Sequence, residues 1–154
     1  MRPRIAFFLP FFALVIMLCG CRINAESPQE EVKVERKGEL TPNEQLNRTI
    51  ENYFASFNHV ENWSEFATED FVKNVYLWCS GDASNSKSIE EMKLFLKNLE
   101  PRTYDLTGYR VESYDMKGPG AEIFVTREWE NDETDQTSYS IVKIGDEWEI
   151  DDRF

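Results

Sequence analysis

The stretch that decides the fold lies near the C-terminus and reads Val142-Lys143-Ile144-Gly145-Asp146-Glu147-Trp148-Glu149-Ile150-Asp151. Gly145-Asp146 is typical of a two-residue connection between antiparallel strands. Trp148 and Ile150 share one face of the second strand, because successive side chains of a strand point to opposite faces. The stretch therefore predicts a C-terminal β-hairpin in which these two side chains close the core.

The alternating pattern extends upstream over the last third of the chain. Four strand-like runs follow one another, at about 103–115, 120–130, 136–144 and 147–152. Turn residues separate the first three runs, at Lys117–Gly120 and at Asn131–Asp135. Because short turns join antiparallel neighbours, the sequence predicts a four-stranded antiparallel meander.

Ahead of the strands, apolar residues recur with the period of a helix. Thr41-Pro42-Asn43-Glu44 has the pattern of a capping box with proline at the first helical position, and it predicts a helix over about 42–58. Asn62 can cap a second, shorter helix. Ser88-Ile89-Glu90-Glu91 opens a third helix, which Pro101 ends.

These elements predict an α+β fold, with three N-terminal helices packed on a curved four-stranded antiparallel sheet. Phe71 to Trp78 has no clear assignment. The order of elements over residues 41–154, together with the ending Val142–Asp151, resembles the nuclear transport factor 2-like, or cystatin-like, cone fold. That superfamily includes ketosteroid isomerase, dehydratases, polyketide cyclases and domains without known chemistry, so the resemblance implies a fold rather than an activity.

The first 21 residues have the layout of an export signal. Two arginines precede an apolar run over residues 5–18, and the end, Leu18-Cys19-Gly20-Cys21, resembles the bacterial lipobox. The resemblance implies cleavage after Gly20 and acyl chains on Cys21, which would attach the chain to a lipid bilayer. Ordinary cleavage after Ala25 and an uncleaved membrane anchor are the alternatives.

We therefore expect a lipoprotein signal peptide at residues 1–20, the lipidated Cys21 with a disordered tether at residues 21–40, and a folded domain at residues 41–154. Arg22 follows the lipidated position, where an inner-membrane retention signal of enteric bacteria would have Asp. The resemblance thus implies a cell-envelope location, on the periplasmic side of the outer membrane in a Gram-negative host.

Charge and cysteine content narrow the function further. Without residues 1–20 the formal charge is 15 − 29 = −14, because Arg2 and Arg4 leave with the signal. So acidic a chain repels phosphate backbones, which argues against nucleic-acid binding. Cys79 is the single thiol left beside Cys21, so no internal disulfide is expected, and its apolar neighbours predict a buried side chain.

Metal chemistry has little support in the sequence. His59 is the only histidine, and no cysteine lies at ligand spacing from it, which argues against a zinc site. The acid-rich segment Glu128–Asp135 lacks the ordered alternation and glycine of a calcium-binding loop, so we expect a solvated hairpin tip. No metal and no cofactor is therefore expected.

Arg127 is the clearest candidate for a functional side chain. It shares the predicted core face of its strand with Ala121, Ile123, Val125 and Trp129. A buried guanidinium needs a carboxylate partner, and Asp152 shares a face with Trp148 and Ile150. Either Arg127 and Asp152 form a structural ion pair, or Arg127 faces the open end of the cone and binds an anionic ligand.

Aromatic residues complete the candidate site. Tyr53 and Trp63 lie on predicted helix faces and either line a ligand cavity or fill the core. Tyr139 is one of several tyrosines that could face a carboxylate across such a cavity, as an isomerase of the ketosteroid type requires. No residue matches a catalytic motif of the superfamily, so no catalytic residue is carried over.

The sequence thus predicts a non-catalytic, membrane-anchored envelope lipoprotein. Its domain would bind a small apolar or anionic ligand, or another envelope protein, through Arg127, Asp152, Tyr53, Trp63 and Tyr139, and a homodimer through the sheet is a further expectation. The alternative is a small-molecule isomerase or dehydratase of the same fold.

Overall fold

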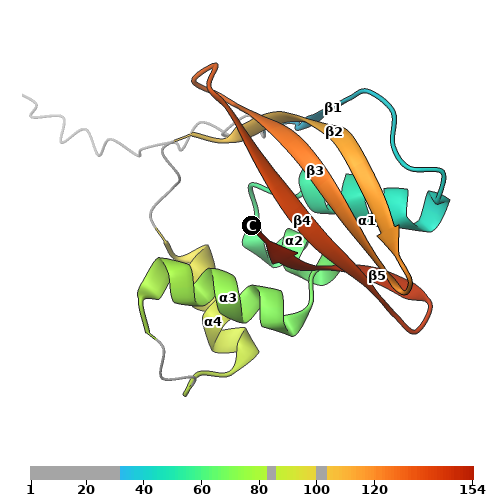
Figure 1. The fold of residues 1–154 in the computed structure, drawn as a ribbon. Helices are drawn as coiled ribbons and strands as arrows, with labels where there is room; N and C mark the ends of the chain where they lie inside the picture. Colours follow the sequence, from blue (N-terminus) through green and yellow to red (C-terminus); the bar gives the residue numbers. More distant parts are fainter. Residues whose placement is uncertain (1–31, 83–85, 100–103) are drawn as a thin grey trace, which may run out of the picture. The chain divides into compact units, whose positions relative to one another are not determined.

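The computed structural model describes residues 32–82, 86–99 and 104–154, which belong to one compact unit, Glu31–Phe154. Its elements follow in the order β1 (Glu35–Lys37), α1 (Glu44–Ala55), α2 (Val60–Trp63), the 3-10 turn η1 (Ser64–Phe66), α3 (Glu69–Ser80), α4 (Ile89–Lys97), β2 (Leu106–Lys117), β3 (Gly120–Trp129), β4 (Thr134–Ile144) and β5 (Glu147–Arg153). The strands form one sheet in the order β1-β2-β3-β4-β5 (Figure 1). The predicted signal peptide, Cys21 and Pro101 lie outside the described residues.

The predicted fold class is wrong in three respects. Glu35–Lys37, expected to belong to a tether, forms a fifth strand beside β2. This strand runs parallel to β2, whereas the other neighbours are antiparallel, so the sheet is mixed. Residues Phe71–Trp78 lie in the helix α3, so the described part of the chain has four α-helices, all between β1 and β2 in the sequence.

The strand β1 forms through contacts that are distant in sequence. Val34 is only 9 % exposed, and the charged side chains that follow it pair with other elements. The Arg36 guanidinium lies 2.7 Å from the Glu51 carboxylate of α1, and the Lys37 amine lies 2.6 Å from Glu128 of β3. A charged segment with few apolar residues resembles a disordered linker in its sequence. It is a strand here because it pairs with β2 and forms ion pairs with α1 and β3, none of which its local sequence indicates.

Helix α3 begins and ends at clear signals. The Thr68 hydroxyl accepts a hydrogen bond from the Phe71 N–H at 3.1 Å, as an N-cap does. Phe71, Val72 and Tyr76 form the buried face of the helix. Gly81 ends it with φ of +68°, a left-handed conformation that favours glycine.

The other predicted caps are partly correct, and Asn62, predicted to cap the second helix, instead lies inside α2, whose N-cap is His59. The capping box of Ser88 and Glu91 is confirmed at the start of α4. At the start of α1 the cap is Asn43 rather than Thr41, and its side chain accepts hydrogen bonds from the N–H groups of Gln45 and Leu46. The helix therefore begins at Glu44, two residues later than predicted.

The core lies between α1 and the inner face of the sheet. Trp148 and Ile150 are 6 % and 0 % exposed, which confirms that the C-terminal hairpin closes the core. The predicted inner face of β3 is also confirmed, because Ala121, Ile123, Val125 and Arg127 are buried and Trp129 is partly buried against the core. The Thr49 hydroxyl donates a hydrogen bond of 3.0 Å to the Trp148 carbonyl and joins α1 to β5.

Within the described residues, no helix combines the length and the apolar character needed to cross a bilayer.

Candidate functional site

Four of the five predicted ligand-binding residues lie in one continuous row inside the domain. The ring centroids of Trp63 and Tyr53 are 6.0 Å apart, and those of Tyr53 and Tyr139 are 5.7 Å apart. The Arg127 guanidinium donates a hydrogen bond of 3.2 Å to the Tyr139 hydroxyl. None of the four is more than 6 % exposed. The structure thus brings Trp63, Tyr53, Tyr139 and Arg127 together, as neighbours in a packed interior.

Arg127 pairs with Asp135 and not with Asp152. Two guanidinium nitrogens donate to the two carboxylate oxygens of Asp135, at 2.7 and 2.5 Å. The guanidinium carbon also lies 5.0 Å from the centroid of the Trp129 ring. Burial is the largest single influence and lowers the pKa of the Arg127 guanidinium, but the hydrogen bonds and electrostatic interactions with Asp135 and Tyr139 together outweigh it, so this pKa is raised. Of the two alternatives, the structure has Arg127 in an ion pair, but the predicted partner Asp152 is wrong, because Asp135 takes its place.

A β-bulge places Asp152 on the other face of the sheet. Ile150 pairs with Ile141, but Asp152 pairs with Ser140, so one extra residue of β5 lies between the two pairs. A bulge interrupts the alternation of side chains along a strand. Asp152 therefore lies on the same face of the sheet as its partner Ser140, and this is the outer face, where Ser140 also pairs with Glu122. Its carboxylate accepts a hydrogen bond of 2.8 Å from the Arg153 N–H.

The turn residues Asn131–Asp135 place Asp135 outside the predicted strands, so the sequence pattern does not indicate it as the partner of Arg127. In the structure β4 already begins at Thr134, and Asp135 is directly opposite Arg127 in the β3–β4 register. Counting the register back from the turn at residues 130–133 would have found the pair.

Aromatic rings fill the space around Tyr53. Its ring meets five others edge to face, with centroid distances of 5.2 to 6.1 Å, from Phe54, Phe57, Trp63, Phe71 and Tyr139. Burial raises the pKa of the Tyr139 phenol, so this group stays protonated at neutral pH. The side chains expected to line a cavity therefore contact one another.

A surface groove lies beside this interior, between the helices. It has a volume of about 370 Å³ and is lined by Asn58, His59, Val60, Glu61, Trp63, Val75, Cys79, Leu96, Lys97 and Leu99. We refer to it as the helical groove, because α2, α3 and α4 form its walls. Trp63 is the one predicted site residue that lines it.

The helical groove has a mixed lining, in which apolar side chains alternate with polar ones such as Asn58 and His59, and a charged rim. Lys97 and Glu61 face each other with a nitrogen–oxygen distance of 3.3 Å, and both side chains are about half exposed. The backbone N–H of Glu61 donates to its own carboxylate, and Lys97 adds to this effect, so the pKa of Glu61 is lowered. Cys79 is exposed at the groove, which corrects the expectation that it is buried.

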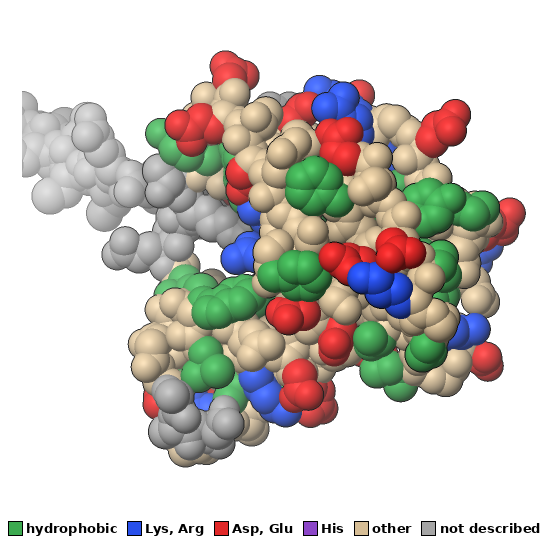
Figure 2. Space-filling model, in the orientation of Figure 1, with side chains coloured by type: hydrophobic (Ala, Val, Ile, Leu, Met, Phe, Trp, Pro, Cys, Tyr) green, Lys and Arg blue, Asp and Glu red, His purple; other side chains and the backbone are tan. Residues whose placement is uncertain are grey.

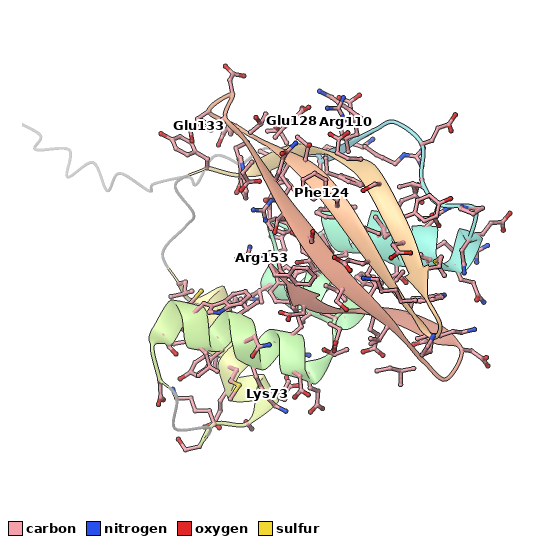
Figure 3. The ribbon with its side chains drawn as sticks, viewed as in Figure 1. Lys73, Arg110, Phe124, Glu128, Glu133 and Arg153 are labelled. Carbon is pink, nitrogen blue, oxygen red and sulfur yellow. The ribbon has the colours of Figure 1, made fainter. Side chains whose placement is uncertain are left out.

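The outer face of the sheet is polar. Glu112 accepts hydrogen bonds from Thr126 at 2.5 Å and from Arg110 at 2.9 Å, and Lys117 pairs with Glu122. The Thr126 and Arg110 hydrogen bonds lower the pKa of the Glu112 carboxyl. Phe124, labelled with Arg110 in Figure 3, is 36 % exposed among these groups. A homodimer through this face stays a prediction.

No cluster of three or more histidine, cysteine or carboxylate side chains that could bind a metal occurs among the described residues. The acid-rich segment is a hairpin tip: Asp132, Glu133 and Thr134 are exposed, and Glu128 is engaged with Lys37.

Comparisons with known proteins give no family for this chain. No protein-family model matches the sequence, and no curated protein matches it. Among solved structures, the chain is similar to a SEC-C motif-containing protein from Rhodopseudomonas palustris, with a TM-score of 0.32 and 11 % identity. That similarity covers 62 % of this chain and 74 % of the other.

Proposed function

We propose that this protein is a lipid-anchored lipoprotein of the bacterial cell envelope, and that its domain binds a small amphiphilic ligand in the helical groove without catalysing a reaction. The helical groove, in which apolar side chains of three helices lie beside the cation of Lys97, is the observation that carries the binding part. The anchoring part is supported by the export-signal pattern of the first 21 residues, which ends in the lipobox-like Leu18-Cys19-Gly20-Cys21.

The size and chemistry of the groove favour a ligand with an apolar body and an anionic group. Its volume of about 370 Å³ falls within the range of small-molecule sites. Val60, Val75 and Leu96 offer apolar contacts. An exposed ion pair such as Lys97–Glu61 contributes little stability, so an anionic group of the ligand can replace Glu61 as the partner of Lys97.

The distribution of carboxylates favours binding over catalysis. An isomerase of the ketosteroid type needs a carboxylate in an apolar pocket. Arg127 is the one charged side chain among the buried polar residues in the described ranges, and Glu61, the carboxylate at the groove, has a lowered pKa. A carboxylate with a lowered pKa is a weaker base than an ordinary one.

A fluorescent probe that is both apolar and anionic, anilinonaphthalene sulfonate, tests the groove on residues 32–154, which contain the whole described core. Lys97→Gln should weaken binding several-fold. The matched control is Lys93→Gln, because Lys93 lies on the same helix and pairs with Glu90 away from the groove lining. Equal binding by the two variants contradicts the proposal.

The anchor has its own test in a bacterial host. Cys21→Ser should abolish incorporation of labelled palmitate and move the protein from the membrane fraction to the soluble fraction. Cys19→Ser is the matched control and should leave both unchanged. A mature N-terminus at Glu26 would instead indicate ordinary secretion.

A further inference from the structure

The helical groove lies at the end of the domain where the chain enters it. The Asn58 side chain, which lines the groove, accepts a hydrogen bond from the Leu106 N–H and donates one to its carbonyl, both at 3.0 Å. Leu106 is the first residue of β2, and β1 pairs with this strand from Glu35 opposite Gly108. The groove and β1 therefore both lie beside the first residues of β2, and Figure 1 shows β1 next to this strand.

Two hairpin turns mark the opposite end of the sheet. β2 is about 36 Å long, at about 3.3 Å for each of the steps between its 12 residues. The turn between β2 and β3 follows at Lys117, and Gly120 of β3 pairs with Val142 near the turn between β4 and β5. These turns are thus separated from the groove by most of the length of the sheet.

The covalent chain limits how far the groove end can lie from the acylated residue. The described domain begins at Val32, which follows Cys21 by 32 − 21 = 11 residues, and this length of chain spans at most about 40 Å when fully extended. This reach limits the chain entry beside the groove to about 40 Å from an anchor at Cys21, whereas the two hairpin turns can lie farther away by most of the length of the sheet.

We infer that the ligand of the helical groove is an acyl chain of a bilayer lipid, taken up from the membrane that anchors the protein; this rests on the proposed function. Exposed aromatic and apolar side chains occur at this end: Trp78 is 52 %, Tyr104 is 44 % and Leu99 is 38 % exposed. Apolar side chains gather over α3 and α4 in Figure 2. Trp and Tyr are enriched where proteins meet the bilayer interface.

Charge specifies the kind of lipid. Lys97 at the groove rim suits the phosphate of a headgroup. The acidic turn between β3 and β4 lies at the same end of the sheet, since Leu106 pairs with Trp129, and Glu133 is labelled there in Figure 3. Acidic side chains repel an anionic surface, so a zwitterionic bilayer is the favoured source of the acyl chain.

The test uses the full acylated chain in phosphatidylcholine vesicles, with a small fluorophore on the native thiol of Cys79, which lines the groove. Lipids brominated on their acyl chains should quench this fluorophore at least twofold more strongly than one on Asp146→Cys in a Cys79→Ser background. Asp146 lies in the turn between β4 and β5, at the opposite end. Replacing half of the lipid with phosphatidylglycerol should reduce the quenching at Cys79.

A second measurement leaves the groove free of a label. A water-soluble maleimide should alkylate Cys79 several-fold more slowly in vesicles than in lipid-free buffer, with no change at Asp146→Cys. Equal quenching and equal alkylation at the two positions, in protein that floats with the vesicles, overturn the inference and leave the anchor intact. Protein that is not acylated and does not float overturns the anchor and the inference together.

Discussion

Arg127 of β3 and Asp135 of β4 face each other across the sheet, joined by two hydrogen bonds of 2.7 and 2.5 Å. The Arg127 side chain is 7 % exposed and that of Asp135 is 43 % exposed. A buried cation therefore has a carboxylate that remains in contact with water. This difference in exposure determines how much the free energy of unfolding should fall when either partner is replaced.

Asp135→Asn should lower the free energy of unfolding by about 1–3 kcal/mol, because it leaves a buried guanidinium without its anion. Arg127→Met should cost less, since water can hydrate the half-exposed Asp135 and methionine fills the apolar space. Urea unfolding of both variants measures the difference. Arg110→Met, on the exposed outer face, is the control, and a larger loss for Arg127→Met than for Asp135→Asn would contradict this assignment.

The strand β1 should contribute measurably to stability. A chain that begins at Gly38 lacks Val34 and the ion pairs of Arg36 and Lys37, and we expect it to lose about 1–3 kcal/mol relative to residues 32–154. Thermal and urea unfolding of the two chains would measure this loss. The double variant Arg36→Gln, Lys37→Gln removes the ion pairs and keeps Val34. Its loss of stability should be less than half of the loss caused by the truncation.

Asn58 should be important for the start of β2. Asn58→Ala removes both hydrogen bonds to Leu106, which should cost about 1–3 kcal/mol, because the N–H and carbonyl of this buried residue lose their partner. Asn52→Ala, at an exposed position of α1, is the control. Equal stability of the two variants would show that water replaces the Asn58 side chain.

The capping box of α4 should give the protein a pH-dependent increment of stability. The Ser88 N–H and hydroxyl donate to the Glu91 carboxylate and lower the pKa of Glu91. Since the folded-state pKa lies below the unfolded value, the increment is present above about pH 4.3 and is lost as the pH falls through the folded-state pKa.

Thermal unfolding of Glu91→Gln measures this increment. The variant should be less stable than the parent at pH 7, and the difference should vanish as the solution is acidified. Glu90→Gln alters the same charge one residue earlier, outside the capping box, and is the control. A difference that persists unchanged at pH 3 would contradict the linkage.

Ser88→Ala removes the N-cap side chain of α4 and should lower the free energy of unfolding by about 1 kcal/mol at neutral pH.

Local patterns predicted the elements whose signals are short in range. The C-terminal hairpin, the inner face of β3 and the Ser88–Glu91 cap depend on alternation, turn residues or hydrogen bonds within a few residues, and all three are confirmed. The same patterns failed for β1, because its order comes from Gly108 and Glu128, about 70 to 90 residues away.

The candidate site was predicted in part. Sequence alone placed Arg127 inside and required a carboxylate for it, but strict alternation along β5 indicated Asp152. The bulge opposite Ser140 shifts that alternation by one residue, and a bulge has no clear signal in this sequence. The helical groove was not predicted, since its walls come from three helices whose packing no local pattern specifies.

The sequence by itself determined which side chains of β3 face the core, that Trp148 and Ile150 close it, where α4 begins, and that the chain is strongly acidic, because side-chain period, capping and charge are properties of neighbouring residues. Only the tertiary structure decided that Asp135 is the partner of Arg127, that Glu35–Lys37 joins the sheet, and that Cys79 lies exposed beside a groove. These depend on register and on packing between distant segments, which are set by the free energy of the whole fold.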